Sequence, residues 1–248
     1  MINKKPYQLS PVALVIIICV IAKFMIHMLT ASNYGYLSDE MYTIAMSKHL
    51  AFGYVDLPPL VPALVALFRV LFGETLFAIH ILSSLAGAAT LVFVCLITKE
   101  LGGKLFAIGL SAVGFMIAPV WLTMNSFCAY DGFDQLILAI FLYVLVMLIK
   151  TDNKRLWLPL GLIAGLAFMT KATILFLGLG FLIALMLSKY RKHLLTRWPW
   201  LGLGPPLDYF INIVLIVNPL LFPLVVMGLV RIFRQLIRHT SAISVSYF

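Results

Sequence analysis

Charge is scarce in this sequence, and acidic charge is the scarcest. Only 11% of the 248 residues are charged, and 9 Asp and Glu stand against 18 Lys and Arg. Soluble domains carry about 25% charged residues. With 63% hydrophobic residues and a mean hydropathy of +1.07, the composition predicts an integral membrane protein. We therefore expect the basic excess to follow membrane topology, and we expect no nucleic acid partner.

Cysteine is also rare, and two common motifs are missing. Cys19, Cys95 and Cys128 make no even framework, so we expect free, packed thiols. No A-x-A cleavage site follows the first apolar run, which is long enough to span, so an uncleaved first helix is expected. The sequence has no glycine-rich phosphate loop, so it does not predict a nucleotide-binding domain.

What the chain has in abundance is long apolar runs. A helix needs about 20 apolar residues to cross the hydrocarbon core. We expect spans near 11–30, 76–98, 105–122, 134–150, 156–169 and 172–188, with a further apolar stretch at 209–230. The predicted fold is therefore an all-α polytopic transmembrane bundle of about six or seven spans.

The charged residues separate onto two sides of these spans. With the N-terminus in the cytoplasm, the basic residues of the cytoplasmic segments are Lys4, Lys5, Lys99, Lys104, Lys150, Lys154, Arg155, Lys189, Arg191, Lys192 and Arg197. The acids of the outer side are Asp39, Glu40, Asp56, Glu74, Asp131 and Asp134. The positive-inside rule thus predicts a multi-pass inner (plasma) membrane protein with a cytoplasmic N-terminus and external segments at 31–75 and 123–133.

The external segment 31–75 contains two short helical patterns. Helices are expected at about 40–52 and 59–72, separated by the turn Asp56-Leu57-Pro58-Pro59. Both are too short to span, so we expect them to lie in the membrane interface.

Four stretches resemble one enzyme family. These are "DEMYTIAMSKHLAFGYVDLPPLVPALVALFRVLFG", "MNSFCAYDGFDQLILAIFLY", "GLIAGLAFMTKATILFLGLG" and "RWPWLG", and the likeness covers about residues 30–202. Together they resemble bacterial membrane glycosyltransferases of the GT-C class, in glycosyltransferase family 39. That family includes relatives of dolichyl-phosphate-mannose-protein mannosyltransferases and of the aminoarabinose transferases of lipid A.

The resemblance implies a reaction as well as a fold. Such enzymes move a sugar from a polyprenyl-phosphate carrier to a lipid, glycan or protein acceptor at the extracytoplasmic face, with inversion at the sugar carbon. The first acid of the D-E pair, Asp39, would be the catalytic base, with Glu40 beside it. The expected substrate-binding residues are Asp56, Arg69, His80, Asp131, Asp134 and Lys171. Leu57 stands where relatives often carry Lys or His, so the phosphate-binding cation is not fixed by the motif.

Each of these residues also has a purely structural interpretation. Asp39, Asp131 and Asp134 can be helix caps, Glu40 can favour the helix dipole, and Asp56 can be a turn residue. Lys171 can snorkel, and His80 can be a packing residue. Lys23 and His27, one turn apart in the first span, can face a lipid phosphate or snorkel outward. A divalent metal shared by outer carboxylates is left open.

The end of the chain departs from the family. A single span through 209–230 from cytoplasmic Arg197 would leave Arg231, Arg234 and Arg238 outside. Relatives are about twice as long, so we expect a GT-C-type catalytic half at 1–200 and an atypical segment at 201–248, fused across a deletion near 201–208. Two further functions stay open: a small transporter or channel with an acidic outer cation site, and an inactive truncated homologue.

Overall fold

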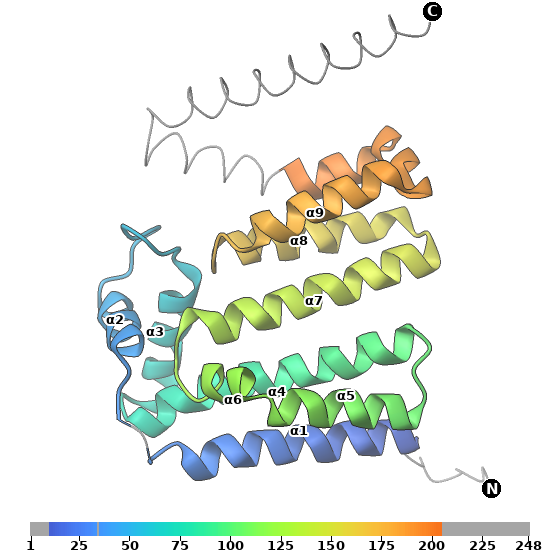
Figure 1. Ribbon diagram of the computed structural model, residues 1–248. Helices are drawn as coiled ribbons and strands as arrows, with labels where there is room; N and C mark the ends of the chain where they lie inside the picture. The colour runs from blue at the N-terminus through green and yellow to red at the C-terminus, as the bar shows by residue number, and fades with distance from the viewer. Residues whose placement is uncertain (1–9, 34, 205–248) are drawn as a thin grey trace, which may run out of the picture. The chain divides into compact units, whose positions relative to one another are not determined.

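The structure is a computed structural model that describes residues 10–33 and 35–204 (Figure 1). Its α-helices are α1 (Pro11–Thr30), α2 (Ser38–Lys48), α3 (Leu60–Phe72), α4 (Leu76–Glu100), α5 (Leu105–Ile117), α6 (Pro119–Met124), α7 (Tyr130–Thr151), α8 (Trp157–Phe168) and α9 (Ile174–Leu187). Two 3-10 helices are η1 (Lys154–Leu156) and η2 (Lys189–Leu195), and residues 197–204 are helical as well. This part of the chain contains no strand, so the predicted all-α membrane bundle is confirmed.

Long helices form the body of the bundle. Within the described ranges, α1, α4 and α7 are each long and apolar enough to cross a membrane. Helix α4 is central, because it packs against α1, α5 and α7. Its first turn is capped by the Thr75 hydroxyl, which accepts the Ala78 N–H, as Ser10 does for the Ala13 N–H in α1. These caps explain why both helices begin where they do.

The predicted number of spans is confirmed only in part. The expected span 105–122 is broken, because Pro119 lacks an N–H and forces Ala118 out of the helical region, with ψ 120°. Helices α8 and α9 have 12 and 14 residues. At about 1.5 Å per residue they are about 18–21 Å long, which is short of a 30 Å hydrocarbon core. Helix α9 and η2 together are long and apolar enough for one span, but the chain bends by 103° between them.

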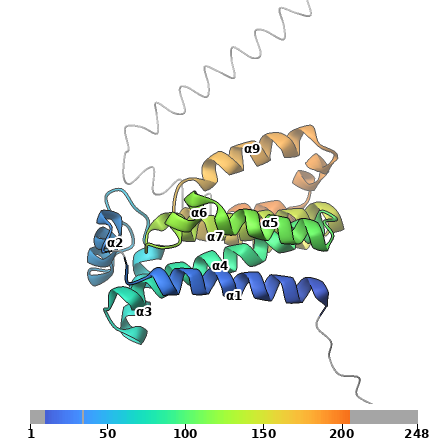
Figure 2. The same cartoon turned by 60° about the horizontal axis from the view of Figure 1, so that its bottom comes forward.

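The two helices expected in the first external segment are present. They are α2 and α3, and Figures 1 and 2 show both at one end of the long helices. Helix α2 ends at Lys48 rather than near residue 52. The Tyr54 hydroxyl lies 3.0 Å from the Met46 carbonyl and 3.2 Å from the His49 carbonyl, and so occupies the acceptors of the last turn.

The predicted domain boundary remains a prediction. Most of the segment 201–248, including the stretch 209–230 and the arginines after it, lies outside the described residues. The described residues belong to one unit that ends at Gly204.

Candidate functional site

Glu40 is a fully buried carboxylate at the start of α2. Its Oε1 accepts the Cys128 N–H at 3.0 Å, and the Nε2 atom of His80 lies 3.1 Å from Oε1 and 3.3 Å from Oε2. Glu40 is 0% exposed and His80 1%. A charge in such a place must be paired, because burial without a partner is very costly. Glu40 therefore does more than favour the helix dipole: it connects α2 to α4 and to the α6–α7 loop.

The hydrogen bonds of His80 indicate where the protons of the His80–Glu40 pair lie. Its Nδ1 atom lies 2.9 Å from the Ala31 carbonyl oxygen, which only accepts, so Nδ1 carries a hydrogen. The other nitrogen, Nε2, faces the Glu40 carboxyl group. A second hydrogen bond there requires one further proton, either on Nε2 or on the carboxyl group. Both ring nitrogens of His80 are thus engaged by the protein itself.

Asp39 precedes Glu40 but has different surroundings. It is exposed, and its Oδ1 accepts a weak bond from the Ser38 hydroxyl at 3.4 Å. The structure contradicts the cap interpretation, because Leu37 is the N-cap residue of α2 and no side chain caps that end. The Asp39 carboxylate is therefore not used to begin the helix.

Asp131 and Asp134 lie inside the first turns of α7. The helix begins at Tyr130, and its N-cap is Ala129, so neither acid is a cap. Asp131 forms an ion pair with Lys171, with 2.6 Å between Oδ1 and Nζ, and both side chains are a little over one third exposed. Asp134 is buried and accepts the Thr173 hydroxyl, which lies 2.7 and 2.8 Å from its two oxygens. Lys171 thus has a carboxylate partner, as snorkelling alone would not require.

Backbone and phenol hydrogen bonds join the two acidic segments. The Tyr130 hydroxyl donates to the Pro58 carbonyl at 3.0 Å, and the Leu60 N–H donates to the Met169 carbonyl at 3.0 Å. With the Glu40–Cys128 bond, these contacts tie α2 and α3 to the α6–α7 loop and to the turn after α8. Among the described residues, no hydrogen bond or ion pair joins Asp39 to the Asp131–Lys171 pair.

Asp56 and Arg69 form two separate groups at the same end. Asp56 accepts the Tyr42 hydroxyl at 2.8 Å, and this bond raises the pKa of the Tyr42 phenol. Arg69 donates to the Ser47 hydroxyl at 2.9 Å and pairs with Glu74. A cleft of about 290 Å³ opens beside Arg69. It is lined by Tyr36, Met41, Ile44, Ala45, Lys48, Arg69, Glu74 and Ile79.

The structure gives no basis for naming a metal. In the part of the chain that it describes, no three His, Cys, Asp or Glu side chains gather closely enough to hold an ion. The carboxylates at this end of the bundle instead have hydroxyl, ammonium, imidazole and amide partners.

Lys23 and His27 are buried inside the bundle rather than extended outward. Their exposures are 1% and 2%. Lys23 Nζ lies 3.3 Å from His27 Nε2 and 4.9 Å from the centre of the Phe115 ring, and His27 Nδ1 lies 3.2 Å from the Ser126 hydroxyl. Ionisable side chains are costly to expose to lipid, so those within a span usually face the bundle interior. Lys23 and His27 do so, and neither extends to the membrane surface.

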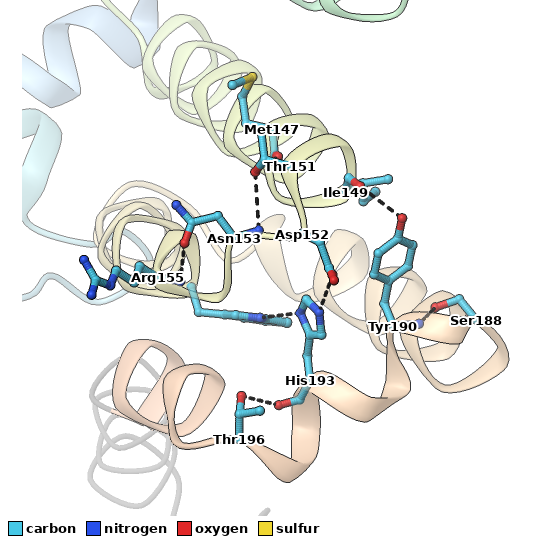
Figure 3. Close-up of polar contacts among 11 residues, drawn as sticks. Met147, Ile149, Thr151, Asp152, Asn153, Arg155, Ser188, Tyr190, His193 and Thr196 are labelled. Carbon is cyan, nitrogen blue, oxygen red and sulfur yellow. Dashed lines mark hydrogen bonds and ion pairs between the residues drawn. The ribbon is translucent and has the colours of Figure 1, made fainter.

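A polar network at the opposite end was not predicted from the sequence. His193 is fully buried, with its Nε2 2.7 Å from Asp152 and its Nδ1 3.2 Å from the Trp157 indole nitrogen (Figure 3). Indole only donates, so Nδ1 accepts and Nε2 carries the hydrogen that is donated to Asp152. The bond to His193 lowers the pKa of Asp152. Thr173 was not predicted as a site residue either, although it lies only two positions after Lys171, which was.

These features define a class of protein: a helical membrane bundle that gathers most of its described carboxylates at one end and most of its described basic residues at the other. The chain belongs to the family described as dolichyl-phosphate-mannose-protein mannosyltransferase, whose model matches residues 56–215. This confirms the resemblance and identifies a membrane glycosyltransferase of the GT-C type. Asp39 and Glu40 precede the matched range, whereas the other predicted site residues lie within it. No curated protein and no solved structure matches the chain.

Proposed function

We propose that the protein moves a sugar from a polyprenyl-phosphate carrier to an acceptor at the extracytoplasmic membrane face, with inversion at the sugar carbon. The acceptor is a lipid, glycan or protein. Asp39 accepts the proton of the attacking hydroxyl. A general base of this kind contributes about 10²–10⁴-fold to the rate.

One observation carries the proposal: of two adjacent acids, one is buried and the other is exposed. Glu40 is buried and bonded to His80 and the Cys128 N–H, whereas Asp39 is exposed on the same first turn. A carboxylate that is not engaged by the fold keeps lone pairs for a substrate proton. The buried neighbour and His80 fix the first turn of α2, so they position Asp39.

The leaving group is a polyprenyl phosphate, and its developing charge needs a cation. Lys171 is the first candidate, because its ammonium group is partly exposed. It lies in the turn after α8, which the Leu60–Met169 hydrogen bond joins to α3. Arg69 is the second, because it lines a cleft beside α2. Asp56, Asp131 and Asp134 are proposed to orient sugar hydroxyls and these cations.

The experiment supplies labelled polyprenyl-phosphate sugars to membranes that contain the full chain. Wild type should consume one of them, and Asp39→Asn should abolish transfer at unchanged expression. Glu100→Gln is the control, because this carboxylate is paired with Lys150 at the other end of α4. Transfer that survives in Asp39→Asn would contradict the base role, and an Asp39-dependent ion flux without transfer would favour a channel.

A further inference from the structure

An apolar groove lies on the basic half of the bundle, away from the acids of α2 and of the start of α7; the nearest carboxylate is Asp152, which is bonded to the lining residue His193. Its volume is about 450 Å³, and side chains of α7, α8 and α9 line it. Figure 1 shows these three helices beside one another. The floor is firmly packed, because the Phe181 ring lies 5.8 Å from Trp157 and 6.2 Å from Phe141. Ligand sites in proteins have volumes of about 300–1,000 Å³, so the groove is large enough to hold a molecule.

The residues that the structure describes, 10–33 and 35–204, leave this space unfilled. Gly180 lines the groove, and a Cβ atom added there would meet no atom within 4 Å. The wall from Phe176 to Ser188 runs for about 18 Å along α9, at about 1.5 Å per residue. One leaflet of a bilayer has a hydrocarbon depth of about 15 Å. The groove therefore has the length of a single lipid chain.

The polar residues at one end of the groove are already bonded within the protein. The Tyr190 hydroxyl donates to the Ile149 carbonyl, and the Ser188 hydroxyl donates to the Leu185 carbonyl. Both nitrogens of His193 are occupied as described above (Figure 3). A sugar or nucleotide would find few donors here, so the interior suits hydrocarbon.

Positive charge surrounds the same end. After Leu187 the chain turns by 103° into η2, which begins Lys189-Tyr190-Arg191-Lys192. The Lys189 ammonium lies 5.3 Å from the centre of the Tyr190 ring, which itself lines the groove. Lys189, Arg191 and Lys192 are all exposed. Basic segments at a membrane surface attract anionic headgroups.

We propose that this groove binds one acyl chain of an anionic phospholipid, with the phosphate of its headgroup at Lys189, Arg191 and Lys192. Hydrocarbon matches the lining, and the negative headgroup complements the basic turn. The bound lipid fills the space between α7 and α9 and holds η2 at the membrane surface. This site does not depend on the proposed transfer reaction, since none of its residues belongs to the acidic end.

The test uses the full chain in micelles, with native mass spectrometry to count bound lipid. Phosphatidylglycerol and phosphatidylcholine of identical chains are the two probes. Wild type should retain one phosphatidylglycerol per chain in preference to phosphatidylcholine. Gly180→Phe should lose this retention, because its ring occupies the groove. Gly178→Phe is the matched control, since a Cβ there also meets no atom within 4 Å but the residue does not line the groove.

A second variant tests the headgroup without altering packing. Lys189→Gln should weaken phosphatidylglycerol retention about fivefold, because one basic residue contributes about 1 kcal/mol near an anionic headgroup. It should leave phosphatidylcholine unchanged. Equal retention of both lipids by wild type, retention of polyprenyl phosphate but not phosphatidylglycerol, or undiminished binding by Gly180→Phe would each overturn the proposal. Melting temperatures of Gly180→Phe and Gly178→Phe should agree, which separates loss of the site from loss of the fold.

Discussion

Removing the carboxyl group of Glu40 should destabilise the protein strongly, and replacing it with an amide of the same shape should not. In Glu40→Ala, the Cys128 N–H loses its acceptor and the His80 Nε2 faces an empty space, with both residues buried. Breaking one partner of a buried pair costs about 3–5 kcal/mol. The orphaned N–H alone accounts for about 1–3 kcal/mol of that total.

Glu40→Gln keeps the shape and most of the bonds. The amide oxygen accepts the Cys128 N–H, and the amide nitrogen donates to Nε2 of a neutral His80 whose Nδ1–H stays on Ala31. We therefore expect a cost below about 1.5 kcal/mol. The free energy of unfolding of both variants is measured by denaturant titration in mixed micelles. Similar losses in the Ala and Gln variants would refute the bonding scheme, and so would a negligible loss in Glu40→Ala.

Three further predictions concern other parts of the bundle. Lys171→Gln should lower transfer about 10²–10³-fold while changing stability by less than about 1 kcal/mol, because its ion pair is partly exposed; Lys171→Arg should restore part of the rate in the same assay. Gly87→Ala should cost about 1–3 kcal/mol, because its Cβ would lie 2.5 Å from Asn125; Gly109→Ala, which meets no atom within 4 Å, should not lower the melting temperature. Asp152 has a lowered pKa in the folded state, so its contribution to stability is present above the usual Asp pKa of about 4 and lost as pH falls through the lowered value. The melting temperature of Asp152→Asn should therefore depend less on pH than that of wild type in that acidic range, and equal slopes would contradict this.

The features that sequence analysis predicted well are those that local chemistry decides. Apolar length marked α1, α4 and α7, and the turn before Pro59 separated α2 from α3. The break at Ala118 followed from Pro119, but the apolar run around it concealed the break. The family was confirmed because its motifs are spread over much of the chain.

The features that it could not predict depend on contacts between distant segments. Glu40 accepts an N–H from Cys128, 88 residues away, and nothing in either local pattern indicates that bond. The pairing of His193 with Asp152 is of the same kind, because the two residues are 41 positions apart and α8 and α9 lie between them in the chain. The roles of the acids and cations around α2 and the start of α7 stay predictions until the variants are assayed.

The two neighbouring acids on α2 are not interchangeable. Consecutive residues of a helix point about 100° apart, so Asp39 and Glu40 face different media although they adjoin in the chain. Only the longer side chain reaches from α2 to both a backbone amide and an imidazole. Reversing their order would preserve composition and net charge, yet it would leave a one-methylene gap in the interior and put the longer, looser arm at the surface.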